Sequence, residues 1–124
     1  MFIDHIGFAV ADYQRSKAFY RRCLAPLGLG LIVEIDGWAG FGRADKAELW
    51  FGEDAMPQHP MHIAFAAADR ACVDRFYRAG ISAGARDNGA PGLRTVYHPH
   101  YYGAFLLDPD GHNIEAVCHK PCTE

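Results

Sequence analysis

The chain has 124 residues, half of them hydrophobic and 22% charged, which is the composition of an ordinary globular protein. This length suits one domain, because each half alone is too short to bury a good core. A formal net charge of -3 gives no electrostatic reason to expect nucleic acid or an anionic membrane as a partner. No run approaches the roughly 18 apolar residues of a membrane span, and we expect no signal peptide at the start. The cysteines form no Cys-x-x-Cys pair, so we expect reduced thiols and a cytoplasmic protein.

The first half predicts a strand, a helix and three further strands. Residues 2–10 alternate between bulky apolar side chains and a second face, which carries a histidine followed by small residues. Asp12 is the expected N-cap of the helix, which ends near Pro26 and Gly28. The bulky face consists of Ile6, Phe8 and Val10, and the second face of His5, Gly7 and Ala9. The three further strands are expected over residues 29–35, 38–43 and 47–52.

The second half begins in the same way. Ile63 and Phe65 form a bulky strand face, and His62 lies on the opposite face with two alanines. Asp69 is the expected N-cap of a helix, which loosens near Gly80. The second half therefore predicts its own strand and helix, with a histidine facing away from the bulky side.

Three strands and a long loop are predicted to complete the second half. The strands are expected over residues 82–86, 102–107 and 113–118. The sequence Asp-Pro-Asp-Gly at 108–111 is a strong turn signal between the last two strands. Residues 87–101 are rich in glycine and proline, and we expect a long functional loop there that has no counterpart in the first half.

Residues 5–21 and 62–78 are two copies of one segment. With a shift of 57 positions, nine of the seventeen positions are identical. An internal repeat of this kind indicates the architecture. We therefore predict an α+β fold for one domain, residues 1–124, made of two βαβββ modules at about 1–55 and 58–124. Its sheet is expected to have one packed face and one cavity-forming face.

Two histidines and two glutamates are candidate metal ligands. His5 and His62 occupy equivalent positions of the repeat, and core packing does not explain why a histidine recurs. The last strand of each half carries one glutamate among apolar residues, Glu48 and Glu115, and a carboxylate is costly to bury unpaired. Strand alternation would project all four side chains into one concavity, and imidazole with carboxylate suits Zn, Ni, Mn, Fe or Co. The alternative is hydrogen-bonded structural histidines and solvated glutamates.

This pattern resembles the vicinal oxygen chelate superfamily, which includes glyoxalase I, fosfomycin-resistance proteins, extradiol dioxygenases, methylmalonyl-CoA epimerase and bleomycin-resistance proteins. The likeness rests on the βαβββ repeat, the two histidines and the closing segment Asp-Pro-Asp-Gly-His-Asn-Ile-Glu at 108–115. It implies a cup-shaped mixed sheet with helices on its outer face, and a homodimer. It also implies a divalent ion (Zn, Ni, Mn or Fe) held by His5, His62 and Glu115, with Glu48 matching the fourth ligand of glyoxalase I.

Two features depart from glyoxalase I. Many glyoxalase I sequences carry a basic residue four positions after the first histidine, where it helps to hold glutathione. Ala9 takes that position here and argues against glutathione use. The second feature is the Tyr- and His-rich segment at 97–102, whose groups could bond a substrate or transfer protons. We predict catalytic roles for Tyr101 and Tyr102, and the alternative is a surface loop that aromatic side chains simply order.

The main hypothesis is a metal-dependent lyase or isomerase that acts on a small oxygenated substrate through an enediolate-type intermediate. Glu48 would be the fourth ligand or the general base. If the ion is Fe(II) and Glu48 stays off the metal, an extradiol-type dioxygenase is the alternative. A second hypothesis is a metal-free protein of bleomycin-resistance type, and a third is a scaffold without chemistry. The second would sequester a planar ligand between Trp38, Trp50, Tyr101 and Tyr102.

Overall fold

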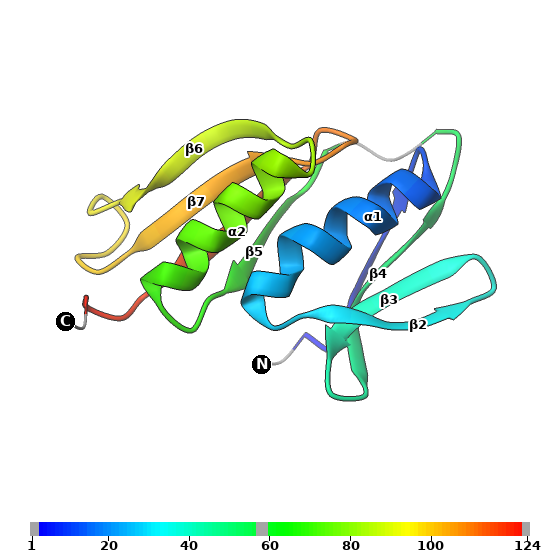
Figure 1. Ribbon diagram of the computed structural model, residues 1–124, viewed down its shortest axis with the longest axis horizontal. Coiled ribbons are helices and arrows are strands. Elements are labelled where there is room, and N and C mark those ends of the chain that lie inside the picture. The colour runs from blue at the N-terminus through cyan, green and yellow to red at the C-terminus, as the bar shows by residue number, and fades with distance from the viewer. Residues whose placement is uncertain (1–2, 57–59, 123–124) are drawn as a thin grey trace.

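The computed structural model describes residues 3–56 and 60–122. The strands of its first module form a four-stranded sheet in the order β1-β4-β3-β2 (Figure 1). The pair β1–β4 is parallel, and the other two pairs are antiparallel. The elements are β1 (Ile6–Val10), α1 (Tyr13–Leu24), the 3-10 helix η1 (Ala25–Leu27), β2 (Gly30–Ile35), β3 (Trp38–Arg43) and β4 (Lys46–Glu53).

The second module repeats this topology. Its sheet has the order β5-β8-β7-β6, again with one parallel pair, β5–β8. The predicted α+β fold of two βαβββ modules is therefore confirmed. The elements are β5 (His62–Ala66), α2 (Arg70–Ser82), β6 (Arg86–Leu93), β7 (Tyr102–Leu107) and β8 (Asn113–Cys118).

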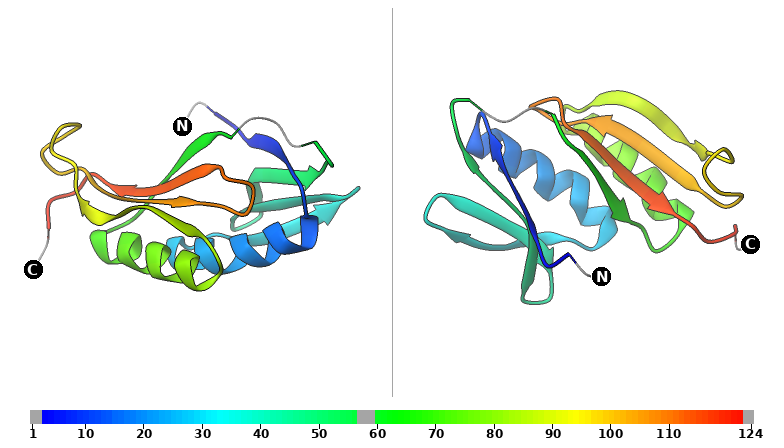
Figure 2. Two further views of the ribbon diagram at one scale, coloured as in Figure 1. Left: turned by 90° about the horizontal axis from the view of Figure 1, so that it is seen from above. Right: turned by 180° about the vertical axis from the view of Figure 1, so that it is seen from behind.

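Both helices lie on the same side of the two sheets (Figure 2). The strands β1 and β5 are edge strands of their sheets, and they run through the middle of the molecule, where the two sheets face each other. One buried apolar cluster includes side chains of both modules, among them Phe8 of β1, Phe19 of α1 and Phe76 of α2. The expected packed face of each first strand is thus correct. Among the described residues, neither helix is long and apolar enough to cross a membrane.

The two helices begin where the repeat predicts. The side chain of Asp12 accepts a hydrogen bond from the backbone N–H of Arg15, and Asp69 accepts one from Cys72. Such N-caps satisfy backbone donors that have no partner inside the helix. The carboxylate of Asp69 has a pKa below its usual value, chiefly because it accepts the Cys72 N–H.

The region 82–101 differs from the sequence expectation. Helix α2 continues to Ser82, β6 spans Arg86–Leu93, and only residues 94–101 form the connection to β7. The register of β6 shifts on both sides of Gly89, which has a φ of 148°. Because β6 is an edge strand, it tolerates these irregularities and Pro91, which cannot donate to a neighbour. The predicted strand at 82–86 and loop at 87–101 are therefore wrong, and β6 is the counterpart of β2.

Candidate functional site

His62 and Glu115 form the best-defined polar pair on the concave face. Strand β5 begins at His62, and Glu115 of β8 pairs with Ala64 in the parallel register. His62 Nε2 and Glu115 Oε1 lie 2.8 Å apart. Glu115 is 1% exposed, whereas the His62 side chain is 54% exposed. A buried carboxylate requires polar partners, and the histidine connects this one to the open side of the sheet.

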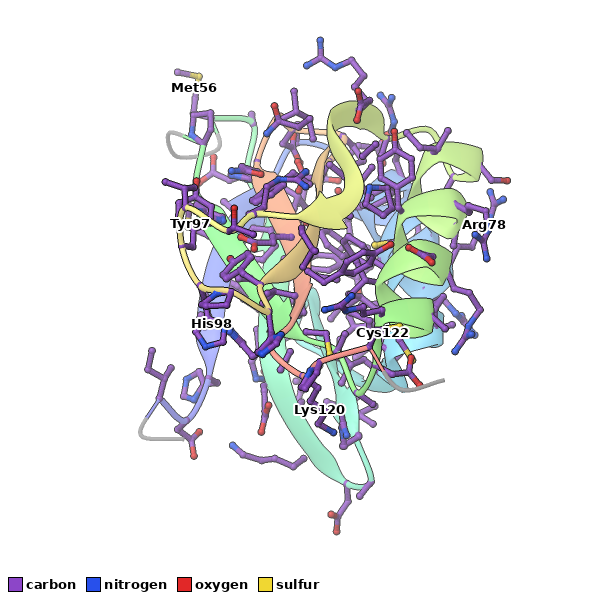
Figure 3. All side chains as sticks on the ribbon, turned by 90° about the vertical axis from the view of Figure 1, so that its left-hand side faces the viewer. Met56, Arg78, Tyr97, His98, Lys120 and Cys122 are labelled. Atoms are coloured by element: carbon purple, nitrogen blue, oxygen red, sulfur yellow. The ribbon has the colours of Figure 1, made fainter. Side chains whose placement is uncertain are left out.

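Tyr101 provides the second partner of Glu115. Its hydroxyl donates a short hydrogen bond to Glu115 Oε2. Burial and the neighbouring Glu115 raise the pKa of Tyr101 to about 12, so the phenol keeps its proton at neutral pH. Figure 3 shows the loop before β7, with Tyr97 and His98 at the molecular surface. The loop residue predicted to act in catalysis therefore contacts a predicted metal ligand.

His5 and Glu48 belong to the first module. His5 precedes β1, is largely exposed, and its Nδ1 lies 2.7 Å from Asp4 Oδ1. Glu48 is exposed on β4. His5, Glu48 and His62 all line a cavity of about 240 Å³, whose other lining residues are mostly apolar and come from both modules. Three of the four predicted ligands therefore border one cavity, and the fourth is bonded to His62.

The strand registers identify the equivalent residues of the two modules. Gly7 of β1 pairs with Trp50, and Ala64 of β5 pairs with Glu115. Since Gly7 and Ala64 match in the repeat, the structural counterpart of Glu115 is Trp50. Glu48, the one glutamate expected on the last strand of the first half, lies two positions before Trp50.

A β-bulge in strand β4 lies at Glu48. In the β3–β4 register, Phe41 pairs with Leu49 and Gly42 pairs with Ala47, so Glu48 is the extra residue on β4. A bulge places two successive residues opposite one and interrupts simple alternation. Glu48 consequently borders the same cavity as Leu49, although alternation predicts opposite faces.

Of the four predicted ligands, His62 and Glu115 make a close pair. Among residues 3–56 and 60–122, the donor atoms of the four do not form a set of three within 4.8 Å of one another. The pair His62–Glu115 nevertheless fits a shared ion. Two neighbouring ligands of an octahedral ion with bonds near 2.1 Å lie about 3.0 Å apart, and the pair is separated by 2.8 Å. The four-ligand site itself stays a prediction.

A sequence model of the Glyoxalase/Bleomycin resistance protein/Dioxygenase superfamily matches residues 2–116. The chain belongs to this superfamily. A comparison with curated proteins gives no significant match.

Solved structures of similar proteins agree with the membership of this superfamily. The chain is 28% identical to a glyoxalase/bleomycin resistance protein from Albidiferax ferrireducens T118, with a TM-score of 0.83 and coverage of 98% of this chain and 100% of that one. A family enzyme from Burkholderia phytofirmans PsJN is 19% identical, with a TM-score of 0.73 and coverage of 95% and 98%. The E144Q mutant of glyoxalase I from Zea mays is 22% identical, with a TM-score of 0.72, and the match covers 93% of this chain and 46% of that one. The last two likenesses show the shared fold.

This superfamily member has a second group of candidate ligands in its closing segment. Donor atoms of Asp108, Asp110 and His112 lie within 4.8 Å of one another, and this is the one such group of three in the described parts of the chain. By spacing alone, the group could hold a metal ion. The sequence interpretation identified a turn here and missed the cluster, although the Asp-x-Asp-x-His spacing was a visible signal.

Hydrogen bonds already occupy Asp108. Its Oδ1 accepts from the backbone N–H groups of Asp110 and His112, at 2.9 and 2.8 Å. Its Oδ2 accepts from the hydroxyl of Tyr20 at 2.5 Å. Burial raises the pKa of Asp108 above its usual value, although these hydrogen bonds oppose the shift. The turn of the second module is thereby fastened to α1 of the first.

The protonation of His112 argues for a structural role of the cluster. His112 is 1% exposed, and its Nδ1 accepts from the backbone N–H of Met61 at 2.9 Å. A neutral ring with Nδ1 as acceptor carries its proton on Nε2, which is then a donor and no metal ligand. His112 Nε2 and Asp110 Oδ2 are buried without a hydrogen-bond partner in the described part of the chain. A bridging water, which can accept from one and donate to the other, suits these two atoms better than a cation.

Tyr102 lies away from the pair His62–Glu115. Its hydroxyl donates to Asp74 Oδ1 of α2 at 2.6 Å, and the Arg70 guanidinium lies 5.1 Å from the centre of its ring. Burial and Asp74 raise the pKa of Tyr102 to about 12. These contacts give Tyr102 a role in docking the helix, and its catalytic role stays a prediction.

Proposed function

We propose that the protein is a metal-dependent lyase or isomerase of glyoxalase type, acting on a small oxygenated substrate through an enediolate-type intermediate. His5, His62 and Glu115 are the proposed ligands, and Glu48 is the fourth ligand or the general base. The observation that carries this proposal is the contact of His62 with Glu115 beside a cavity that His5 and Glu48 also line. Membership of the superfamily adds support.

The side chains have separable roles in this proposal. When bound, a divalent ion (Zn, Ni, Mn or Fe) supplies Lewis-acid polarisation of a substrate oxygen. Glu48 removes a proton from the hydroxyl-bearing carbon beside a carbonyl and returns it to the former carbonyl carbon. The hydroxyl proton is lost and a proton is gained at the former carbonyl oxygen through solvent, so the hydroxyl and carbonyl groups exchange places. Tyr101 holds Glu115 in place through its hydroxyl. If the ion is Fe(II) and Glu48 stays off the metal, the same residues would suit a dioxygenase.

The first test is metal content. Protein purified without chelator should carry about one equivalent of a transition ion, measured by elemental mass spectrometry, or take one up on titration with Zn, Ni, Mn or Fe(II). His62→Ala and Glu115→Gln should lose this uptake. His100→Ala is the matched control, because His100 is exposed and does not line the cavity. Uptake below about a tenth of an equivalent by the wild type would exclude the proposal.

The second test is proton exchange. Hydroxyacetone in D₂O should lose its C–H signals faster with the metal-loaded enzyme, because an enediolate exchanges the proton next to the carbonyl. Glu48→Gln should abolish the exchange and leave metal uptake in place if Glu48 is the base. Exchange at the wild-type rate in this variant would remove Glu48 from that role.

One observation favours a metal-free binding protein as a second candidate. Both oxygens of Glu115 are already bonded to protein groups, and Trp50 takes the place of the second carboxylate. Such a protein would sequester a planar ligand on its aromatic side chains. Ligand binding that survives both His5→Ala and His62→Ala would support this candidate, and its loss would count against it.

We also infer a homodimer in the cytoplasm that binds a small molecule. All four cysteines, Cys23, Cys72, Cys118 and Cys122, are free thiols, which suits a reducing compartment. Light scattering after size exclusion tests the dimer, and a monomer at micromolar concentration would contradict it.

A further inference from the structure

A second cavity lies on the concave side of the first module. Its volume of about 630 Å³ is within the range of small-molecule sites. Asp4 and His5 line both this cavity and the smaller one that His62 borders. The two cavities are therefore neighbours that meet at a proposed metal ligand. The lining residues are Asp4, His5, Gly7, Ile35, Asp36, Trp38, Lys46, Ala47 and Trp50.

Two indole rings in this cavity rest on glycines. Trp38 pairs with Gly52 across β3 and β4, and Trp50 pairs with Gly40. A Cβ on Gly52 would lie 2.9 Å from two atoms of the Trp38 ring, and one on Gly40 would lie 2.9 Å from the Trp50 ring. No larger residue fits beneath either ring without a shift. Each indole is therefore supported on one side by the backbone of the sheet.

Covering the glycines explains the position of only one face of each indole ring. Covering a strand glycine with an aromatic ring stabilises a sheet, and this explains one face of each indole. Both tryptophans line the cavity, and Trp38 is 41% exposed. An aromatic face of this kind offers stacking area and a negative quadrupole. The rings are thus positioned to contact a ligand.

The charges around the rings favour a cation. The cavity is lined by two carboxylates, Asp4 and Asp36, and one ammonium, Lys46. Lys46 Nζ lies 2.7 Å from Asp4, so that pair is compensated. Asp36 is in the turn before β3 and makes no hydrogen bond or ion pair within the described residues. The two carboxylates and the ammonium together leave one negative charge beside the negative faces of the two indoles.

We propose that Trp38 and Trp50 form a subsite for a planar, positively charged aromatic ring, with Asp36 as its counter-charge. This proposal rests on the proposed function in one respect: the ring would place its substituents beside His5, which both cavities share. The substrate class is then an oxygenated compound that carries a flat cationic ring. Cation–π attraction to tryptophan is the strongest of its kind, and stacking requires a flat partner.

The two tryptophans make a direct test possible. They are the only ones in the chain, so intrinsic fluorescence reports on this cavity alone. N-methylquinolinium is the probe, with 2-naphthoate as a flat anion and cyclohexyltrimethylammonium as a cation that is not flat. We expect N-methylquinolinium to quench the fluorescence and to bind at least about tenfold more tightly than either comparison compound. Equal affinity for the three would overturn the proposal.

Variants separate ligand binding from support of the sheet. Trp38→Leu and Trp50→Leu should each weaken N-methylquinolinium binding about tenfold in calorimetry, whereas Trp38→Phe should keep most of it. Asp36→Asn should weaken binding and reduce its dependence on salt. Asp45→Asn is the matched control, since it removes the same charge from a nearby turn outside the cavity. Circular dichroism identifies variants that fail to fold, and unchanged binding by folded Trp38→Leu would overturn the proposal.

The metal proposal can fail separately. The titration is repeated with chelator and with Glu115→Gln, which lies outside this cavity. If the wild type binds N-methylquinolinium but takes up no metal, the metal proposal is excluded and the proposed subsite is supported. If the wild type takes up metal but shows no preference for N-methylquinolinium, the proposed subsite is excluded and the metal proposal is supported.

Discussion

In the second module, His62 is bonded to a buried glutamate, and Tyr101 from the loop before β7 donates a hydrogen bond to that glutamate. In the first module, His5 is paired with exposed Asp4, and the position of the glutamate is taken by Trp50. The backbones repeat one topology. One half therefore presents a compact polar pair, and the other presents an open aromatic cavity. The proposed ion binding is thus centred on one half, and the proposed recognition of a flat ring on the other.

The largest expected effect is the difference in metal affinity between variants of the two glutamates, Glu115 and Glu48. Glu115→Gln should weaken metal affinity by at least about 100-fold, because this buried carboxylate contacts the other proposed ligand. Glu48→Gln should weaken it by about tenfold or less, since Glu48 lies at a bulge and is exposed. Competition with a coloured chelator measures both. A larger loss for Glu48 than for Glu115 would reverse the comparison.

A second comparison uses the tyrosines that match in the repeat, Tyr20 and Tyr77. Tyr20→Phe should lower the free energy of unfolding by about 1–3 kcal/mol, because it leaves buried Asp108 without a partner for Oδ2. Tyr77→Phe removes a bond to exposed Asp87 and should change it by less than about 1 kcal/mol. Urea unfolding of both variants is the measurement. Equal losses would show that the turn at Asp108 does not fasten the modules together.

The topology was predictable because the repeat carries it. Matched histidines, N-cap aspartates and alternating faces all lie within short segments, and local rules suffice for such features. The face of His62 and the burial need of Glu115 follow from the same rules. These features account for the contact between His62 and Glu115, whose role as metal ligands stays a prediction.

The rest depends on pairing between distant segments. The bulge at Glu48 is defined by which β3 residue each β4 residue faces, and no local pattern signals it. Strand β6 has the glycine and proline content of a loop, and it is a strand because β7 provides partners. The group around Asp108 is closed by Tyr20 and Met61, which lie far away in the sequence. Contacts between distant segments therefore determine these three features, and the local sequence does not reveal them.

The smallest expected effect concerns the charge of Asp108, which lies where the two modules meet. Its pKa is raised by burial, so the folded state binds its proton more tightly than the unfolded state does. The contribution of this carboxyl to stability is thus fully present below the ordinary aspartate pKa and falls as pH rises through the folded value. Asp108→Asn keeps a side-chain oxygen for the backbone donors and removes that titration. We expect it to change stability at pH 7 by less than about 1 kcal/mol.

The pH dependence isolates this contribution from that of Asp69, whose lowered pKa acts in the opposite direction. The stability of the wild type relative to Asp108→Asn, from urea unfolding between pH 4 and 7, should decrease as pH rises. Asp69→Ala provides the reverse control, because stability from a lowered carboxylate pKa is lost as pH falls. A constant difference between the wild type and Asp108→Asn would mean that the buried turn carries no uncompensated charge. The Tyr20 hydrogen bond, and not the charge of Asp108, would then be what this turn contributes to the contact between the modules.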